Sequence, residues 1–148
     1  MKILIDADAC PVTKIVESIA KENEIKLLLI CDTSHIITVD YGEVIVVSKG
    51  NDSADFYLVN KVSKGDIIVT GDYGVAAMAL AKGGHPIHHN GKWFTSDNID
   101  QMLFERHMSK KARKGSNHYR GKGPKKRTPL DDKRFYESFL SLLSVIRS

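Results

Sequence analysis

The sequence predicts a three-layer α/β/α fold with a mainly parallel central sheet and C-terminal helices. Short runs of Val, Ile and Leu recur along the chain without polar alternation, and helical apolar patterns separate most of them. The expected order is strand, helix, strand, strand, helix, strand, helix, strand, which is typical of a parallel sheet with helices on both faces. With 148 residues, of which 42% are hydrophobic, the chain suits a single domain spanning residues 1–148.

Five apolar segments are the expected strands. Residues 3–5, 25–31, 44–47 and 67–70 are rich in Val, Ile and Leu, and residues 86–88 form a weaker fifth segment. Because these segments do not alternate with polar residues, each is expected to be buried on both faces of the sheet.

Helical patterns fill the connections between these strands. The first expected helix begins at Pro11 and has apolar residues at positions 12, 15, 16 and 19. A second is expected to begin at one of residues 51–53, which suit a helix cap, and to end near Gly65. An Ala-rich third helix is expected over residues 75–82, before two glycines.

Two further helices are expected after the sheet. The first covers residues 96–114, and the polar, Gly-rich residues 115–124 that follow are expected to form a loop. The second opens at Thr128, a capping residue followed by a proline and, three positions on, by Asp131. Its apolar face should pack against the body of the protein and consists of Phe135, Phe139, Leu142, Leu143 and Ile146.

The charges are distributed unevenly. Residues 106–127, here called the basic arm, contain ten Lys and Arg residues and no acid. The other 12 basic and 18 acidic residues leave the rest of the chain with a net charge of −6. This pattern favours nucleic acid as the partner, with RNA preferred over DNA. The candidate nucleic-acid-binding residues are Lys110, Lys111, Arg113, Lys114, Arg120, Lys122, Lys125, Lys126 and Arg127.

Other classes of protein are disfavoured by what the sequence lacks. No apolar run approaches the roughly 20 residues of a membrane span, and residues 3–5 are too short for the core of a secretory signal. Cys10 and Cys31 are too few for a disulfide framework and lack the spacing of a zinc site. No glycine-rich nucleotide-binding loop is present. We therefore expect a cytoplasmic protein that does not interact with membranes.

Acidic residues follow several of the expected strands. Asp6 and Asp8 come after the first, Asp32 after the second and Asp72 after the fourth. Because the carboxyl ends of parallel strands meet at one edge of a sheet, where ligands bind in open α/β folds, these acids are expected to lie close together.

Asp52 and Asp55, at the start of the second helix, are expected to approach the same edge. Clustered carboxylates repel one another unless a cation neutralises them, and oxygen ligands favour Mg²⁺ or Mn²⁺. The candidate metal ligands are Asp6, Asp8, Asp52, Asp55 and Asp72. Each also has a structural interpretation, as a helix cap for Asp52, Asp55 and Asp72 or as a turn residue for Asp32.

Histidine and cysteine offer weaker signals. His85, His88 and His89 lie in a Gly/Pro/Asn-rich turn without cysteine partners, so they are expected to be surface-loop residues rather than zinc ligands. Trp93, after Asn90-Gly91, is expected to pack or to continue a hairpin. Cys10 precedes a helix start, which can lower a thiol pKa, but no histidine is near it in sequence to act as its base.

Four motifs are distributed over nearly the whole chain. They are Ile-Asp-Ala-Asp-Ala-Cys-Pro-Val (5–12), Asn-Asp-Ser-Ala-Asp (51–55), Thr-Gly-Asp-Tyr-Gly-Val-Ala (70–76) and Arg-Gly-x-Gly-Pro-Lys-Lys-Arg-Thr (120–128). Together they resemble the bacterial YaiI/YqxD family, which is considered PIN-like. The resemblance implies a PIN-like α/β domain whose acids bind Mg²⁺ or Mn²⁺ and hydrolyse nucleic-acid phosphodiesters.

Carried over by position, the resemblance implies that Asp6, Asp55 and Asp72 are acids of the active site. Asp8 is an addition in this motif, and Asp52 lies beside the motif acid of the second helix. At the fifth strand, where PIN nucleases often supply another acid, this chain has histidines and Asn90 instead.

Three functions follow as hypotheses. The first is a Mg²⁺- or Mn²⁺-dependent nuclease with Asp6, Asp8, Asp55 and Asp72 as catalytic residues. The second is a phosphatase of the haloacid-dehalogenase kind, because Asp6 and Asp8 resemble the nucleophile and acid/base pair of that superfamily. The third is a non-catalytic RNA-binding module whose acids hold a structural ion.

Overall fold

The computed structural model describes residues 1–8, 10–32, 37–48, 53–115 and 126–148, and for Arg106 and residues 109–115 it describes the backbone only. The elements, in chain order, are β1 (Lys2–Asp6), α1 (Thr13–Glu22), β2 (Lys26–Asp32), β3 (Glu43–Val47), α2 (Ser53–Lys61), β4 (Ile67–Val69), α3 (Tyr73–Ala81), β5 (His85–Ile87), α4 (Ile99–Gly115) and α5 (Pro129–Arg147).

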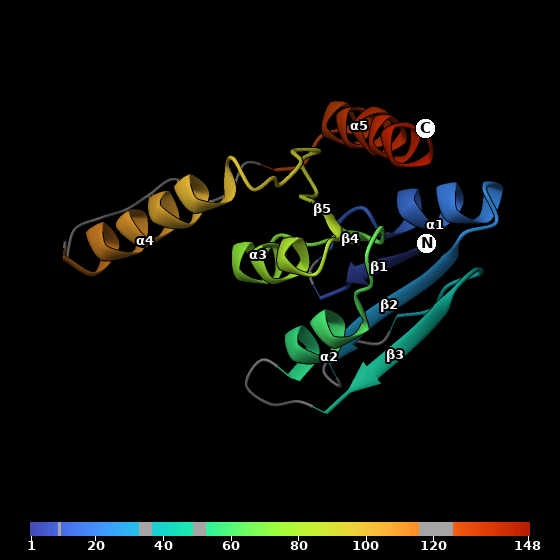
Figure 1. Ribbon diagram of the computed structural model, residues 1–148, viewed down its shortest axis with the longest axis horizontal. Coiled ribbons are helices and arrows are strands. Elements are labelled where there is room, and N and C mark those ends of the chain that lie inside the picture. Colours follow the sequence, from blue (N-terminus) through green and yellow to red (C-terminus); the bar gives the residue numbers. More distant parts are fainter. Residues whose placement is uncertain (9, 33–36, 49–52, 116–125) are drawn as a thin grey trace.

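A single sheet of five strands lies at the centre of the described chain, in the order β3-β2-β1-β4-β5 (Figure 1). All neighbouring strands pair in parallel, and Ile3 of β1 aligns with Leu27 of β2 and Ile67 of β4. The prediction of a mainly parallel sheet is confirmed. Because β1 and β4 are central neighbours, the segments that follow them emerge side by side.

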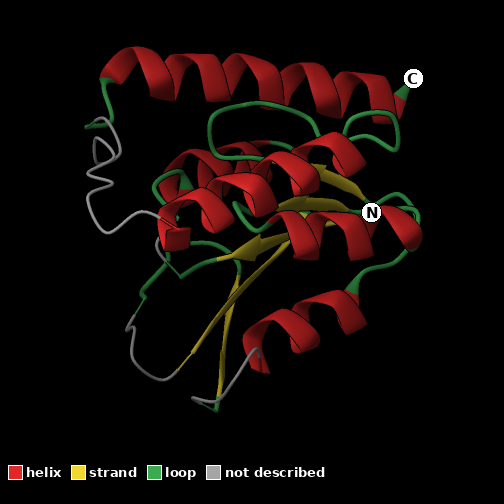
Figure 2. Ribbon diagram, turned by 90° about the vertical axis from the view of Figure 1, so that its left-hand side faces the viewer, coloured by secondary structure: helices red, strands yellow, loops and turns green. Residues whose placement is uncertain are grey.

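Helices cover both faces of the sheet and complete the predicted three layers (Figures 1 and 2). On one face, Val16 and Ile19 of α1 and Phe135 and Phe139 of α5 share a core with the strands. On the other face, α2 and α3 contribute apolar residues such as Leu58 to a second core. The side chains of the two cores are almost fully buried, and each aliphatic or aromatic group of this kind stabilises the fold by about 1.5–3 kcal/mol.

Helix α4 lies outside this sandwich and packs against α3 through a smaller apolar cluster that includes Ala76, Phe94 and Met102. The chain reaches α4 through the expected hairpin continuation, in which Trp93 forms an antiparallel bridge to Ile87. Trp93 also donates a hydrogen bond from Nε1 to Ser138 Oγ of α5 at 2.9 Å. The turn after β5 is therefore fixed against the C-terminal helix.

Several details differ from the sequence prediction. Helix α2 ends at Lys61 rather than near Gly65, and helix α3 covers Tyr73–Ala81 rather than residues 75–82. Strand β3 is not buried on both faces, because it is an edge strand with one neighbour, and Val46 is 55% exposed. Helix α1 begins at Thr13 rather than at Pro11. Helix α4 begins three residues later than expected, because Thr95 and Asn98 bond reciprocally, backbone amide to side chain, in a turn before it.

The start of α5 is as predicted. Thr128 Oγ1 accepts a hydrogen bond from the Asp131 backbone amide, and the Asp131 carboxylate accepts one from the Thr128 backbone amide, forming a capping box with Pro129 at the first helical position.

None of the described helices is both long enough and apolar enough to cross a membrane.

Candidate active site

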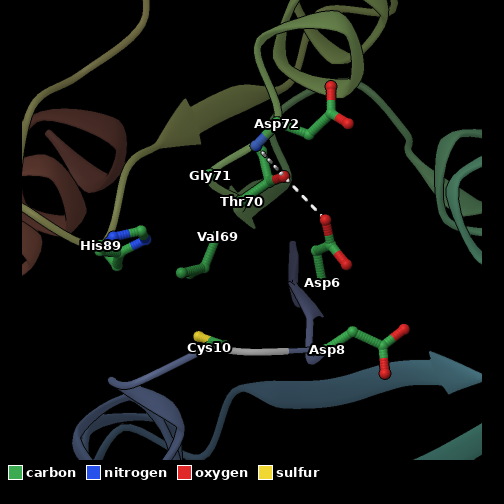
Figure 3. A pocket seen from close by; sticks show the side chains of 8 residues that line it. All are labelled: Asp6, Asp8, Cys10, Val69, Thr70, Gly71, Asp72 and His89. Atoms are coloured by element: carbon green, nitrogen blue, oxygen red, sulfur yellow. Dashed lines mark hydrogen bonds between the residues drawn. The ribbon is translucent and has the colours of Figure 1, made fainter. Parts of the chain in front are cut away.

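A pocket of about 290 Å³ lies at the carboxyl ends of β1 and β4. Three segments form it: the connection after β1, the connection after β4 and the turn after β5. The lining residues are Asp6, Asp8, Cys10, Val69, Thr70, Gly71, Asp72 and His89 (Figure 3). The structure thus brings Asp6, Asp8 and Asp72 to one edge, as the order of strands and acids predicted.

Asp6 is the last residue of β1 and is held by a neighbour on β4. Thr70, which is 2% exposed, donates a hydrogen bond from Oγ1 to Asp6 Oδ2 at 3.0 Å. The same hydroxyl oxygen accepts the amide of Asp72 at 3.0 Å (Figure 3). The Thr70 amide in turn donates to the Ile87 carbonyl of β5 at 3.1 Å. Asp6 therefore receives its hydrogen bond from a rigid donor.

The carboxyl group of Asp6 is unusually hard to ionise. Burial raises its pKa from 3.8 to about 6, the Thr70 hydrogen bond opposes that rise, and the charges of Asp55, Asp8 and Asp72 add to it. All three of those acids therefore act electrostatically on Asp6, as expected of a cluster.

Asp72 has the structural role that its position also allowed. It is the N-cap of α3, and its Oδ1 accepts the amides of Gly74 at 2.8 Å and Val75 at 3.2 Å. Figure 3 shows its carboxylate turned away from Asp6 while the residue still lines the pocket. Asp72 thus combines a helix-capping contact with a negative charge near Asp6.

Asp8 connects two strand ends. Its carboxylate oxygens lie 3.2 and 3.4 Å from the amide nitrogen of Asp32, at the end of β2. This contact orients Asp8 beside Asp6 in the pocket wall. Asp32 itself does not line the pocket.

Asp55 lies in the first turn of α2 and affects Asp6 through its charge, although it does not line the pocket. Asp52 lies outside the described residues. Among the residues that the structure describes, no group of three or more His, Cys, Asp or Glu side chains is arranged to hold a metal ion. The described acids share an edge and an electrostatic field, but among themselves they do not form a complete cage of protein ligands.

His88 and His89 lie in a turn after β5, as expected, but they are more buried than surface-loop residues. His88 and His89 are half-buried, their ring centroids are 4.0 Å apart, and His89 lines the pocket. The turn from His88 to Lys92 is closed by backbone hydrogen bonds, which hold both rings over the sheet edge. Their exposure is lower than expected because the turn folds back on the sheet instead of projecting into solvent.

The surroundings of both histidines favour their neutral forms. Burial lowers the pKa of His88 to about 4, with a smaller contribution from His89. Burial and the nearby charge of Arg127 also lower the pKa of His89. The backbone amide of Asn90 donates a hydrogen bond to His88 Nδ1 at 3.0 Å, so Nδ1 is the unprotonated nitrogen of the His88 ring.

Cys10 lines the pocket from the segment between β1 and α1. Burial raises the pKa of its thiol, although hydrogen bonds from Val12 and Thr13 act in the other direction. The raised pKa favours the protonated thiol at neutral pH, which disfavours Cys10 as a nucleophile.

Lys126 and Arg127 are the described side chains of the predicted nucleic-acid-binding set. Arg127 Nε donates to Asp132 Oδ1 at 2.6 Å, and its charge acts on Cys10, His88 and His89. The end of the basic arm therefore approaches the pocket. Arg120, Lys122 and Lys125 lie outside the described residues, as do the side chains of Lys110, Lys111, Arg113 and Lys114.

Thr70 and His89 are site residues that the sequence prediction missed. His89 follows β5, which neighbours β4 in the sheet, but the position of its ring in the pocket depends on how the turn after β5 folds. The role of Thr70 could not be predicted from the sequence, because it depends on the pairing of β1 with β4.

Comparison with known proteins gives a consistent family assignment. The family model described as "Uncharacterized BCR, YaiI/YqxD family" matches residues 4–145. A UPF0178 protein of Clostridium acetobutylicum is 52% identical over 143 residues, covering 97% of each chain. UPF0178 proteins of Lachnoclostridium phytofermentans (52% over 149 residues, all of both chains) and Alkaliphilus oremlandii (50% over 140 residues, 95% of this chain and 88% of the other) are also similar.

No solved structure matches this chain. The match of the family model begins within β1, ends within α5 and includes every described residue that lines the pocket. The chain belongs to the YaiI/YqxD family.

Proposed function

We propose that the protein is a Mg²⁺- or Mn²⁺-dependent phosphodiesterase that cleaves nucleic acid in the pocket beside Asp6. The position of Asp6 carries the proposal. It is a largely buried carboxylate at the exit of a central strand, with three further acids acting on it and a raised pKa. Holding such a group costs folding stability, and perturbed acids of this kind cluster at functional sites.

The donor set suits a hard divalent cation. Carboxylate and hydroxyl oxygens are the ligands that Mg²⁺ and Mn²⁺ prefer. Mg²⁺ commonly uses only one or two carboxylates together with water and substrate phosphate, so a complete protein cage is not required. Asp6 and Asp8 would hold the cation, while Asp55 and Asp72 would add negative charge around it. The chemistry it supplies is polarisation of the phosphoryl group and neutralisation of developing charge.

The chain's own residues would prepare this site before substrate arrives. The Thr70 hydroxyl donates a hydrogen bond to Asp6 Oδ2, and Asp6 Oδ1 accepts no hydrogen bond from any described residue. The hydrogen bonds of Asp72 to α3 fix the segment that carries Thr70. Preorganisation of this kind lowers the cost of aligning ligands during the reaction.

Nucleic acid, with RNA preferred over DNA, is the proposed substrate and partner. The ten basic residues of the basic arm provide a phosphate-binding charge next to an acidic body, and Arg127 places one of those charges close to the pocket. A cytoplasmic location is proposed with it. PIN-like nucleases, to which the family resemblance points, hydrolyse phosphodiesters with a comparable acidic edge.

The test is cleavage of end-labelled RNA and DNA oligonucleotides by the purified protein with Mg²⁺, Mn²⁺ or excess chelator. Cation-dependent cleavage with RNA cut faster than DNA is expected. Cleavage that persists undiminished in chelator would contradict the proposal.

Two other outcomes would replace the proposal with an alternative. Salt-sensitive RNA binding without cleavage would favour a non-catalytic RNA-binding module. Turnover of phosphomonoesters through a covalent phosphate on Asp6 would favour the haloacid-dehalogenase kind of phosphatase. Both outcomes are read from the same purified protein.

A further inference from the structure

His89 occupies the side of the pocket opposite Asp6 (Figure 3). Among the histidines that the structure describes, His89 is the one that lines this pocket. It lies in the turn after β5, whereas Asp6 is the last residue of β1. The cavity between the two side chains has room for a water and a phosphoryl group, since its volume is about 290 Å³. An imidazole and an acidic cluster therefore face one open space.

The imidazole of His89 is held in place from two sides. A Cβ added to Gly71 would lie 3.2 Å from His89 Cε1 and 3.3 Å from Nδ1, so the ring packs closely against the backbone of Gly71 and would have to shift to admit a side chain. Its other neighbour is His88, at a centroid distance of 4.0 Å. His88 in turn makes edge contacts with Tyr73 and Phe94. Such packing is typical of a side chain whose orientation matters for function.

The charges around His89 keep it available as a proton acceptor. Arg127 disfavours its cationic form, and so does burial, so the pKa of His89 lies below its ordinary value of 6.5. The charged or titratable groups on the surrounding elements are His88 after β5, Tyr73 and Asp72 at α3, Asp6, Asp8 and Cys10 after β1, and Arg127, Asp131 and Asp132 at α5.

We propose that His89 is a catalytic residue of this pocket and acts as the general base that takes a proton from the attacking water. The inference rests on the proposed phosphodiesterase function and adds a residue that the acidic cluster does not supply. In the step, one O–H bond of water breaks and its proton moves to the imidazole while the water oxygen bonds to phosphorus. The ester P–O bond breaks, and the departing oxygen takes a proton from solvent.

The test compares His89→Gln with wild type under the conditions in which wild type cleaves RNA. Loss of a general base lowers rates by roughly 100-fold or more, and the fall should appear in kcat with KM nearly unchanged. The affinity for Mn²⁺, measured by calorimetry, should stay the same because the acids are untouched. Free imidazole added to His89→Ala should restore part of the activity. His85→Gln is the matched control, since His85 is at the amino end of β5 and does not line the pocket.

A pH profile separates a base from a merely structural residue. Wild-type kcat should fall on the acid side as both His89 and Asp6 become protonated. In His89→Gln this limb should be shallower, because only Asp6, with its pKa of about 6, still contributes to it. Activity of His89→Gln within two-fold of wild type, or a defect confined to KM, would overturn the role of His89 and leave the phosphodiesterase itself standing. A wild type without any cleavage would overturn both.

Discussion

Thr70 Oγ1 donates a hydrogen bond to Asp6 Oδ2 and accepts one from the Asp72 amide, each at 3.0 Å. A hydroxyl has one proton to donate, and because its oxygen is used by the Asp72 amide, the proton is directed at Asp6. The ends of β1 and β4 are therefore coupled by a single buried side chain. Burial disfavours the ionised form of Asp6, and the hydrogen bond from Thr70 opposes that effect.

Replacement of Thr70 by valine should raise the pKa of Asp6 above about 6, because the hydrogen bond that opposes the rise is lost. It should also destabilise the protein by about 1–3 kcal/mol, since the Asp72 amide loses its acceptor. Carboxyl-carbon NMR titration and urea unfolding measure the two effects. Thr70→Ser keeps the hydroxyl and is the control. An Asp6 pKa that is the same in the valine variant and wild type would contradict this role.

The ionisation of Asp6 should make stability depend on pH in a defined direction. The folded-state pKa of about 6 exceeds the ordinary value of 3.8, so the folded form binds the proton more tightly. The resulting stabilisation is fully present below pH 3.8 and is lost as pH rises through 6. With chelator present, Asp6→Asn should remove this dependence and increase the unfolding free energy at pH 8 by about 2–3 kcal/mol.

The matched control for that measurement is Asp97→Asn, which changes an exposed carboxyl before α4. It should alter stability by less than about 0.5 kcal/mol. An Asp6→Asn protein that is less stable than wild type at pH 8 would show that the ionised Asp6 carboxylate does not destabilise the folded protein.

Mn²⁺ should stabilise the wild-type protein against heat, because a ligand that binds only the folded state raises Tm with its concentration. At 100 times the dissociation constant the gain is about 2.7 kcal/mol. The gain should vanish in Asp6→Asn and persist in Asp97→Asn. Differential scanning calorimetry at several Mn²⁺ concentrations measures it, and an equal rise in all three proteins would indicate binding elsewhere.

Gly71→Ala should displace the His89 ring, since the new methyl group would approach two ring atoms at 3.2 and 3.3 Å. The cost is about 1–3 kcal/mol in unfolding free energy. In the background of His89→Ala the same substitution should cost much less, because the obstructing ring is absent. This double-mutant cycle isolates the contact, and an unchanged cost in both backgrounds would show that Gly71 serves another purpose.

Much of the fold was predictable because strand burial and helical periodicity are local signals. The central strands β1, β2 and β4 contain continuous apolar runs, and the cap of α5 is formed within the four consecutive residues 128–131. The exposure of β3 was not predictable in this way. It depends on the order of strands in the sheet, which places β3 at an edge beside β2 alone.

The acidic half of the site was predictable and the other half was not. Asp6 and Asp72 follow strands, and the geometry of a parallel sheet brings such ends together. His89 depends on a turn that folds back over the sheet edge, and Thr70 on the pairing of β1 with β4. Those are tertiary contacts between segments far apart in the chain, which no local pattern in the sequence records.

The central claim is that Asp6 is required for cation-dependent cleavage, and one comparison tests it most directly. The rate constant kcat/KM for RNA cleavage with Mn²⁺ would be measured for wild type, Asp6→Asn and Asp97→Asn. The account predicts a fall of at least about 100-fold in Asp6→Asn, in a protein at least as stable as wild type, and no change in Asp97→Asn. Cleavage by Asp6→Asn at the wild-type rate would contradict it.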